Sequence, residues 1–419
     1  MARLFGTDGI RGVVNVDITP DLALALGRAL GHRLGGPGRR VLLGRDTRRS
    51  GEMLSAALAA GLATTGTDAV DLGVVTTPCL VHASLDRRHA AGVMVSASHN
   101  PAPDNGLKVI VGGRKADDAT ECELEQLMEG DHTGLPNAGL GRLRTDADAP
   151  RAYLRHLTEA AGDAFAGLRL AIDCANGSAS SVAPDLFRAL GAEVTVLFAA
   201  PDGRNINEGC GSTHPERMAH TVAAAELDLG LAFDGDVDRL IAADETGTLV
   251  DGDAIMGICA LRRLADGTLR NRVLVATVMS NGGLDRAVRA AGGRVVRTPV
   301  GDRSVLEAME AEDAVMGGEQ SGHVIFRDRS TTGDGLLTAI ELVRAWRAEG
   351  RMPLSELAAR IPRLPQVMLN SPVRRKDTWS EDRAFADAVQ RAADRLGDRG
   401  RVLVRPSGTE PVIRIMVEG

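Results

Sequence analysis

The feature that most constrains the fold is a regular alternation of short apolar segments with helical patterns. In the first stretch of chain, apolar residues 41–43 and 91–95 flank a helical pattern over 51–65. Strands that alternate with helices form parallel sheets, because each crossover back to the same sheet edge needs a dozen or more residues. The first part of the chain is therefore expected to fold as an α/β unit.

The same alternation restarts twice further along the chain. The second unit is expected to contain strands over 168–172, 193–197 and 229–233 and helices over 182–190 and 215–226. The third is expected to contain strands over 273–276, 294–298 and 314–316 and helices over 283–291 and 304–310. The pattern then changes to one strand, a helix over 382–396 and a pair of strands around 405–411. The fold class predicted is α/β, with three similar domains that have mainly parallel mixed sheets, followed by a small C-terminal α+β domain.

Breaks in the pattern place the expected domain boundaries. Polar or proline-containing stretches at 146–150, 244–247 and 361–365 separate the units. Length alone would suggest about three domains. The expected division is 1–148, 149–245, 246–362 and 363–419.

Composition narrows the functional classes. The chain is 44% hydrophobic and has no leader-like or membrane-spanning apolar run, so a cytoplasmic protein is expected. Only 2% of residues are aromatic and the net charge is −7, so nucleic acid is not an expected partner and neither is a membrane. The five cysteines form no C-x-x-C pair, and buried, reduced thiols are expected.

Three aspartates at alternating positions, Asp234, Asp236 and Asp238, follow the apolar segment 229–233. Carboxylates this close repel one another unless a cation neutralises them, and hard oxygen ligands suit Mg²⁺ or Ca²⁺. An acidic surface turn is one alternative. An EF-hand is another, because Glu245 occupies its twelfth position, but Arg239 stands where that loop needs glycine.

A serine and a lysine add phosphoryl chemistry to the predicted metal site. The polar segments 96–101, 234–239 and 317–323 each follow the last strand of a unit, where ligands gather in α/β sheets. Ser98 is followed by His99, but neighbouring side chains on a strand point apart and no Gly-x-Ser-x-Gly motif is present, so a hydrolase is disfavoured. A metal beside a serine suits phosphoryl transfer, and Lys108 could add positive charge unless it is an ordinary surface lysine.

The segment 405–411 predicts a separate anion site. Arg405, Ser407, Gly408 and Thr409, with Arg414 close behind, offer a guanidinium fork, hydroxyls and loop amides to a phosphate. A plain polar turn is the alternative. No Walker-type loop is present in the sequence, so the chemistry need not use ATP.

Six motifs in order resemble the α-D-phosphohexomutases, most closely the bacterial phosphoglucosamine mutases: residues 5–12, 96–101, 234–239, 318–323, 331–335 and 405–411. The resemblance implies four domains around a central cleft. It also implies reversible conversion of glucosamine 6-phosphate to glucosamine 1-phosphate, on the route to UDP-N-acetylglucosamine and cell-wall precursors. A phosphohexosamine is the implied partner, and a homodimer is left open.

The resemblance also implies roles for single residues. Ser98 would carry the phosphoryl group and bind Mg²⁺ together with Asp234, Asp236 and Asp238, and a sugar 1,6-bisphosphate would be the intermediate or activator. Four residues would surround the transferring group: Arg11, His99, Lys108 and Arg239. Lys108 and His323 are the implied proton carriers. Sugar hydroxyls would bind Glu319, Ser321 and His323, and the phosphate that does not react would bind Arg405, Ser407, Gly408, Thr409 and Arg414.

Two positions depart from the family pattern. Val237 stands where the metal loop commonly has glycine, and a positive φ there would cost about 1 to 3 kcal/mol. The chain ends at Gly419, directly after an expected strand over 412–417, where the family usually continues into a helical segment, so the last domain is expected to be either truncated or naturally short. The alternatives to the implied activity are a phosphomannomutase/phosphoglucomutase and a catalytically silent phosphosugar-binding protein.

Overall fold

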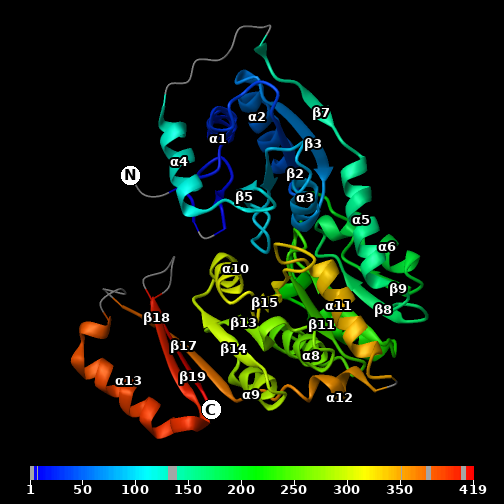
Figure 1. Ribbon diagram of the computed structural model, residues 1–419, viewed down its shortest axis with the longest axis vertical. Coiled ribbons are helices and arrows are strands. Elements are labelled where there is room, and N and C mark those ends of the chain that lie inside the picture. Colours follow the sequence, from blue (N-terminus) through cyan, green and yellow to red (C-terminus); the bar gives the residue numbers. More distant parts are fainter. Residues whose placement is uncertain (1–3, 7, 131–138, 351, 374–378, 407–411) are drawn as a thin grey trace.

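The computed structural model describes residues 4–6, 8–130, 139–350, 352–373, 379–406 and 412–419. Four sheets follow one another along the chain, each built from its own stretch of sequence (Figure 1). The first sheet lies at one end of the molecule, the second and third lie next to each other, and the three-stranded sheet of the C-terminal part lies beside the third (Figure 1).

The first sheet has seven strands, in the order β1-β5-β4-β2-β3-β7 with β6 paired to β5. β2, β3, β4 and β7 run parallel to their neighbours in this group, while β1, β5 and β6 pair antiparallel. The strands are β1 Ile10–Val13, β2 Arg40–Arg45, β3 Asp68–Val74, β4 Ala91–Val95, β5 Asp104–Val111, β6 Arg114–Lys115 and β7 Leu143–Thr145. The helices are α1 Pro20–Arg33, α2 Ser50–Thr64, α3 Thr77–Ser84 and α4 Asp118–Glu129.

Hydroxyl and carboxyl side chains begin several of these helices. Thr19, Thr76 and Asp117 accept hydrogen bonds from backbone N–H groups in the first turns of α1, α3 and α4. Such caps satisfy donors that have no partner inside the helix. A proline follows in the first turn of α1 and of α3, where its missing N–H costs nothing.

The second and third sheets are mixed as well, with orders β12-β11-β10-β8-β9 and β14-β13-β15-β16. The second part contains α5 Asp148–Ala161, β8 Arg169–Asp173, α6 Ala183–Ala189, β9 Glu193–Leu197, α7 Glu216–Ala224, β10 Leu229–Phe233, β11 Leu240–Ala243 and β12 Leu249–Val250. The third contains α8 Gly252–Ala265, β13 Val273–Thr277, α9 Gly282–Ala290, β14 Arg294–Thr298, α10 Asp302–Ala311, β15 Met316–Gly318, β16 Val324–Phe326, α11 Gly335–Arg347 and α12 Leu354–Ala358.

The C-terminal part is an antiparallel sheet with one helix against it. Its strands β17 Gln366–Pro372, β18 Arg401–Pro406 and β19 Val412–Glu418 have the order β17-β19-β18, and the helix is α13 Arg383–Leu396. The expected pair of strands around 405–411 is confirmed, because β18 and β19 flank that segment and pair antiparallel. The domain boundaries at 148/149, 245/246 and 362/363 stay predictions.

One apolar core joins the first three sheets. A single cluster of buried side chains runs from Leu42 in β2 through Phe187 and Phe233 to Phe326 in β16 and Leu357 in α12. The other face of the first sheet has a separate core under α1 and α2. The three sheets are therefore packed as one block, which holds the ends of their strands at fixed distances.

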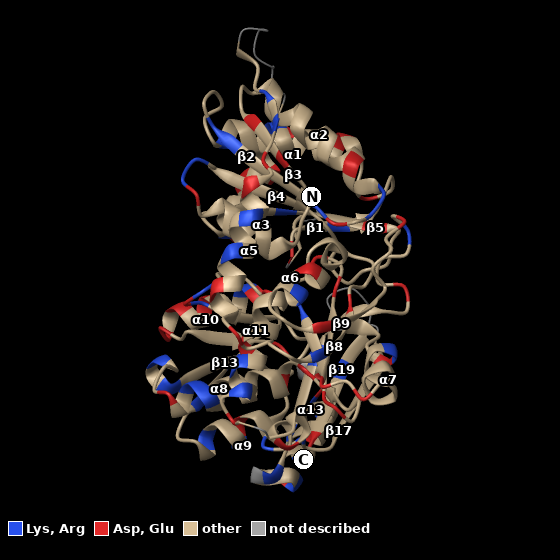
Figure 2. Cartoon of the chain, turned by 90° about the vertical axis from the view of Figure 1, so that its right-hand side faces the viewer, with Lys and Arg blue, Asp and Glu red and all other residues tan. Residues whose placement is uncertain are grey.

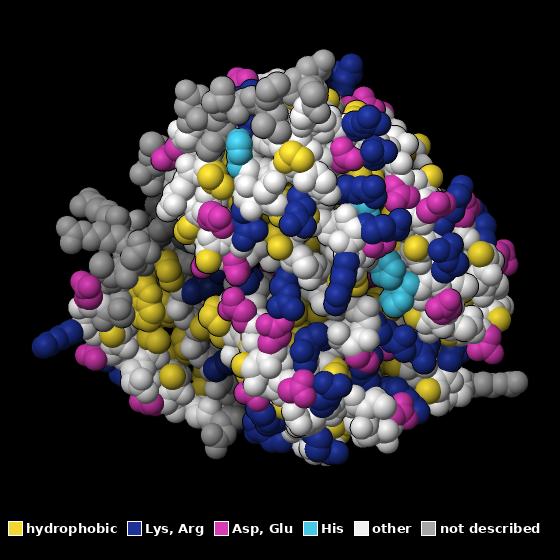
Figure 3. Space-filling view, turned by 45° about the horizontal axis from the view of Figure 1, so that its top comes forward, with side chains coloured by type: hydrophobic (Ala, Val, Ile, Leu, Met, Phe, Trp, Pro, Cys, Tyr) yellow, Lys and Arg dark blue, Asp and Glu magenta, His cyan; other side chains and the backbone are white. Residues whose placement is uncertain are grey.

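Charged residues of both signs are interspersed over the molecule (Figure 2), and hydrophobic side chains gather on the left of the face that Figure 3 shows. Four of the five cysteines are buried, but Cys122 is exposed on α4, which corrects the expectation of five buried thiols. Burial raises the pKa of the Cys79 and Cys210 thiols to about 12. Among the described helices, none has the length and apolar character needed to cross a membrane.

Candidate active site

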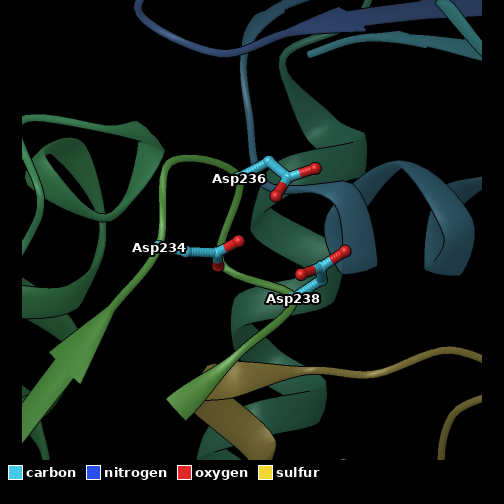
Figure 4. A group of neighbouring side chains, drawn as sticks. All are labelled: Asp234, Asp236 and Asp238. Carbon is cyan, nitrogen blue, oxygen red and sulfur yellow. The ribbon is translucent and has the colours of Figure 1, made fainter. Parts of the chain in front are cut away.

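Asp234, Asp236 and Asp238 lie on the turn between β10 and β11, and their carboxylates project from one side of it (Figure 4). One carboxylate oxygen from each lies within 4.8 Å of the others, and all three residues are buried. Burial excludes the surface-turn alternative, and the flanking strands exclude an EF-hand, which needs flanking helices.

The unpaired oxygens of this cluster fit a hard cation. Asp236 Oδ1 and Asp238 Oδ1 are buried and have no hydrogen-bond partner among the described residues. A buried carboxylate oxygen without a partner is costly, and an oxygen-binding cation would remove that cost. The buried aspartates could therefore bind a metal.

The charges around the cluster shift its carboxyl groups in different directions. Burial, then the negative charges of Asp238 and Asp236, raise the pKa of Asp234 well above its usual range. Burial also opposes ionisation of Asp238, but Lys108 and His323 outweigh it and hold the pKa of Asp238 well below its usual range. Asp238 is thus already matched by positive charge, whereas Asp234 is not.

Ser98 lies on the turn after β4, and its hydroxyl is turned toward Asp234. Ser98 Oγ donates to Asp234 Oδ2 at 2.5 Å, across 136 residues of sequence and from one sheet to the next. The backbone at Ser98 has a φ of 50°, in the left-handed region that L-residues rarely adopt. The sequence-predicted serine and metal cluster are therefore in direct contact.

His99 lies beside the Ser98 hydroxyl, with its Nδ1 3.3 Å from Ser98 Oγ. The expectation that these neighbouring side chains point apart was wrong, because residues 98 and 99 form a turn and the alternation rule holds only in a strand. Burial, followed by the positive charges of Arg239 and Arg11, lowers the pKa of His99 to about 4. His99 is therefore neutral at neutral pH.

A buried network that the sequence did not reveal holds the serine turn in place. The Arg48 guanidinium is paired with Asp46 and donates to the carbonyls of Ser98, at 3.2 Å, and Asn100, at 2.6 Å. Ser96 Oγ donates to Asp46 Oδ2 and accepts from Ser98 N–H. The turn is thus pinned by side chains that touch its backbone and leave the Ser98 hydroxyl free to face Asp234.

The second domain also contributes to this turn. Asn207 Nδ2 donates to the carbonyls of Ser98 and Asn100, at 2.9 and 3.0 Å. Asn207 itself has a φ of 59°, which asparagine tolerates better than most residues. The residue triplet Asp46-Thr47-Arg48 and the isolated asparagine carry no recognisable motif, so only the contacts identify them.

Lys108 lies in the centre of the site rather than on the surface, since only 1% of it is exposed. Lys108 Nζ donates to Asp236 Oδ2 at 2.7 Å and lies 3.5 Å from Asp238 Oδ2 and 3.3 Å from Asp8 Oδ2. Lys108 lies on β5, and its side chain reaches these carboxylates from that strand. Arg11 is paired with Asp8 and donates to Asn100 Oδ1 at 3.4 Å.

The third domain brings His323 to the same place, where Arg239 of the second domain also lies. His323 Nδ1 lies 3.7 Å from Asp238 Oδ1, and its Nε2 accepts from Gly333 N–H at 3.2 Å. Burial alone would lower the pKa of His323, but Asp238 and Asp302 outweigh it and raise the pKa. Arg239 Nε lies 3.8 Å from Asp238 Oδ1, so this guanidinium also lies at the cluster.

Glu319 and Ser321, on the turn between β15 and β16, are half-buried and face each other, with Ser321 Oγ 3.5 Å from Glu319 Oε2. Glu319 Oε1 accepts from Gly301 N–H at 3.0 Å. Glu319 Oε1 thus fixes the loop before α10, and Glu319 Oε2 lies next to the Ser321 hydroxyl.

Val237 has a φ of 65° and a fully buried side chain. The positive φ that would strain a β-branched residue at this position is therefore present. Its backbone is fixed on both sides, because Val237 N–H donates to Asp234 O and Val237 O accepts from Gly335 N–H.

The predicted anion site is only partly described. Arg405 on β18 lies directly opposite Arg414 on β19. Like charges in this position repel each other, and burial together with Arg414 lowers the pKa of Arg405. Ser407, Gly408 and Thr409 lie outside the described residues.

Comparison with known proteins agrees with this fold. Four models of phosphoglucomutase/phosphomannomutase match the chain in order: the three alpha/beta/alpha domains I, II and III over residues 2–134, 151–247 and 251–364, and the C-terminal domain over 368–419. The chain therefore belongs to the phosphoglucomutase/phosphomannomutase family, the class of α-D-phosphohexomutases that the motifs indicated.

Curated relatives named phosphoglucosamine mutase are similar to this chain over its whole length. The chain is 51% identical over 425 residues to the phosphoglucosamine mutase of Moorella thermoacetica, which covers all of this chain and 96% of the relative. It is 52% identical over 430 residues to that of Symbiobacterium thermophilum, covering 100% and 95%. A solved phosphoglucomutase/phosphomannomutase family protein from Burkholderia thailandensis superposes with a TM-score of 0.84 at 29% identity, covering 100% and 93%.

Proposed function

We propose that the protein is a phosphoglucosamine mutase, which interconverts glucosamine 6-phosphate and glucosamine 1-phosphate through a phosphorylated Ser98. The observation that carries this proposal is the contact between the Ser98 hydroxyl and the buried aspartate cluster. Relatives named phosphoglucosamine mutase share about half of all residues over the whole chain and support the substrate.

In the proposed reaction, the P–O bond to Ser98 Oγ breaks while a bond forms from phosphorus to the free hydroxyl oxygen of the sugar. The proton of that hydroxyl passes to a base, Ser98 Oγ takes up a proton as it leaves, and the product is a sugar 1,6-bisphosphate. After this intermediate has reoriented in the site, Ser98 Oγ gives up its proton and forms a bond to the other phosphorus. The sugar oxygen that is released in this step takes up a proton. Lys108 and His323 are the two proposed proton carriers, since each lies beside the aspartate cluster and they come from different domains.

Arg11, His99 and Arg239 are proposed to bind the oxygens of the transferring phosphoryl group. Two of them are cationic and His99 is neutral, so they offer N–H donors without a competing negative charge. When bound by Asp234, Asp236 and Asp238, with phosphorylated Ser98 as a further ligand, Mg²⁺ would offset negative charge on that group. The metal would thus neutralise charge, and Arg11 and Arg239 would orient the phosphoryl group.

Glu319, Ser321 and His323 are proposed to bind the sugar, and Arg405, Ser407, Gly408, Thr409 and Arg414 to hold the phosphate that does not react. A carboxylate such as Glu319 favours the ammonium group of glucosamine over a neutral hydroxyl. The cytoplasmic location and a homodimer stay predictions, and light scattering of the purified protein would test the second.

The proposal is tested by ³¹P NMR of the Ser98-phosphorylated protein with Mg²⁺ and, in separate tubes, glucosamine 6-phosphate, glucose 6-phosphate and mannose 6-phosphate. Preferential formation of glucosamine 1-phosphate is expected. Preference for another sugar would keep the mutase chemistry and overturn the substrate.

Ser98→Ala separates phosphotransfer from binding. The variant is expected to lose turnover while it still binds glucosamine 6-phosphate, because its sugar and phosphate contacts are unchanged. Turnover by this variant would overturn the proposed role of Ser98, and absence of turnover in every wild-type tube would favour a silent phosphosugar-binding protein.

A further inference from the structure

Lys115 is a buried cation that belongs to none of the motifs described above. It lies on β6, at the end of the β5–β6 hairpin of the first sheet, and its side chain is 13% exposed. Its ammonium group is paired with two carboxylates, Asp8 of the first domain and Asp302 at the start of α10 in the third domain. One side chain therefore joins two domains at the site.

Each of these two carboxylates also lies next to one of the proposed proton carriers. Asp8 Oδ2 lies 3.3 Å from Lys108 Nζ, and Asp302 Oδ2 lies 3.8 Å from His323 Nε2. Charged groups thus alternate in sign from Lys108 through Asp8 and Lys115 to Asp302, and the His323 ring lies beside Asp302. Each side chain is at least about four-fifths buried, and ion pairs at such depth interact more strongly than exposed ones.

Asp8 and Asp302 depend on Lys115 to different degrees. Asp8 also pairs with Arg11 and Lys108, so it keeps two cations if Lys115 is neutral. Among the described residues, the only other side chain in a salt-bridge contact with Asp302 is His323. The positive charge of Lys115 therefore matters most for Asp302, and through it for the place of His323 between Asp302 and Asp238.

A second ion pair between the same two elements offers a comparison. Arg114, the neighbour of Lys115 on β6, pairs with Glu310 of α10 at 2.6 Å, and both side chains are more than a third exposed. This pair ties the same domains together at the surface. Surface pairs contribute little to stability, whereas the contacts of Lys115 reach the site itself.

We propose that Lys115 is a positioning residue, which holds Asp8 and Asp302 so that Lys108 and His323 keep a fixed separation across the bound sugar. The inference rests on the proposed mutase function. A fixed separation matters because the bisphosphate presents each of its ends in turn to the same pair of proton carriers. A displacement of about 1 Å can lower the rate of a step by about 100-fold.

The test compares Lys115→Met, Lys115→Arg and the control Arg114→Met in the full chain, phosphorylated at Ser98 and with Mg²⁺. Lys115→Met is expected to lower kcat by about 100-fold with KM for glucosamine 6-phosphate changed by less than about twofold. Lys115→Arg, which keeps the charge, is expected to restore kcat to within about tenfold of wild type. Arg114→Met is expected to stay within about twofold of wild type.

A double-mutant cycle with Asp302→Asn tests the route of the effect. Because both variants break the same tie, the double variant is expected to lose no more than about twofold beyond Lys115→Met. Losses that multiply would overturn the proposal, as would a raised KM with unchanged kcat, or a Lys115→Met variant that behaves like Arg114→Met. If Lys115→Met does not fold, Asp302→Asn alone must show the same loss of kcat at unchanged KM.

Amide hydrogen exchange gives a measurement that needs no turnover. Residues 111–115 and 302–306 are expected to exchange faster in Lys115→Met than in Arg114→Met, because only the first variant loses the buried tie. Equal exchange would overturn the inference. A wild-type protein that turns over no sugar phosphate would overturn the proposed function. Amide hydrogen exchange would then still test whether Lys115 ties the two domains together.

Discussion

Two residues of the site, Ser98 and Val237, hold a backbone conformation that costs an L-residue about 1 to 2 kcal/mol, with φ values of 50° and 65°. Ser98 donates its hydroxyl hydrogen to Asp234, and Val237 lies between Asp236 and Asp238. Neither is glycine, so the surrounding hydrogen bonds must hold both. These two positions therefore give the sharpest tests at the scale of single residues.

The strain at Val237 is tested by comparing Val237→Gly with Val237→Ala. Both variants remove buried methyl groups, but only glycine is relaxed at a φ of 65°. At an ordinary position glycine is the less stable by about 1 kcal/mol, whereas here it is expected to be the more stable by about 1 kcal/mol. Urea denaturation measures the difference, and a more stable alanine variant would contradict the prediction.

The same pair of variants tests whether the strain weakens metal binding. Val237→Gly is expected to bind Mg²⁺ about two- to tenfold more tightly than Val237→Ala, because relaxation of the loop removes part of the strain. Isothermal titration calorimetry gives both affinities. Equal affinities would mean that strain at this position does not reach the carboxylates.

The support of the serine turn is tested by Asn207→Gly, which keeps the φ of 59° and removes only the amide that holds two carbonyls. We expect kcat to fall about tenfold with KM unchanged, because the hydroxyl loses part of its fixed position. Asn271→Gly, at a φ of 53° and exposed, is the matched control and should leave kcat unchanged. Equal kcat values in the two variants would contradict this role.

Among the elements, α8 begins with a buried acid that faces α9. Asp253, which is 4% exposed, accepts from Asn281 N–H at 2.7 Å, and burial raises its pKa to about 7. The folded protein therefore binds a proton here at pH values where the unfolded chain, with a pKa near 3.8, has lost it. The stabilisation is complete below the unfolded pKa and disappears as the pH rises through about 7.

Asp253→Asn is expected to remove this pH dependence. Asparagine keeps an oxygen for the Asn281 N–H group and has no charge to bury. The variant is expected to gain stability relative to wild type between pH 5 and pH 8, by up to about 4 kcal/mol. Thermal unfolding across this range measures the change, and a difference that stays constant with pH would contradict the assignment.

Most elements of the first three sheets could be predicted, because apolar strands and amphipathic helices leave local patterns in the sequence. β4, β9, β10 and β14 begin and end where their patterns predict. β15 begins two residues later than expected, at Met316, since the apolar run there starts before the pairing with β13. β6 and β12 have two residues each, too few to show a period.

Some residues of the site could likewise be predicted from the sequence, and others could not. Ser98 and the three aspartates could be found because their residue types gather at strand ends. Asn207 and Lys115 could not, because they act through partners 109 and 187 residues away in the chain. Such contacts exist only after the domains have packed, and no local pattern precedes them.

At the scale of the whole molecule, the C-terminal domain is attached through a short segment held against α9. The Asn281 side chain accepts from Leu364 N–H at 2.9 Å and donates to Leu364 O at 3.0 Å. Gly283 lets Pro362 O approach so closely that a Cβ there would lie 1.4 Å from it. This attachment sets how the domain that carries Arg405 and Arg414 meets the rest of the chain.

Asn281→Ser tests the importance of this attachment. Serine can still cap α9 but cannot pair with both groups of Leu364. Weaker attachment is expected to increase escape of the bisphosphate about tenfold, because the domain that would retain it closes less often. ³¹P NMR of bisphosphate released per turnover measures this. Arg286→Ala, which removes an exposed contact to Arg399 O, is the control, and equal release would contradict the prediction.

The contact between Ser98 and Asp234 has a consequence for folding cooperativity. The serine belongs to the first sheet and the carboxylate to the second, so a ligand that binds both acts as a crosslink between two domains. A ligand at 100 times its dissociation constant adds about 2.7 kcal/mol to the folded state. Because the two sheets already share one apolar core, loading of the site should raise the temperature of their joint unfolding transition, and a calorimeter could detect loaded molecules without any assay of turnover.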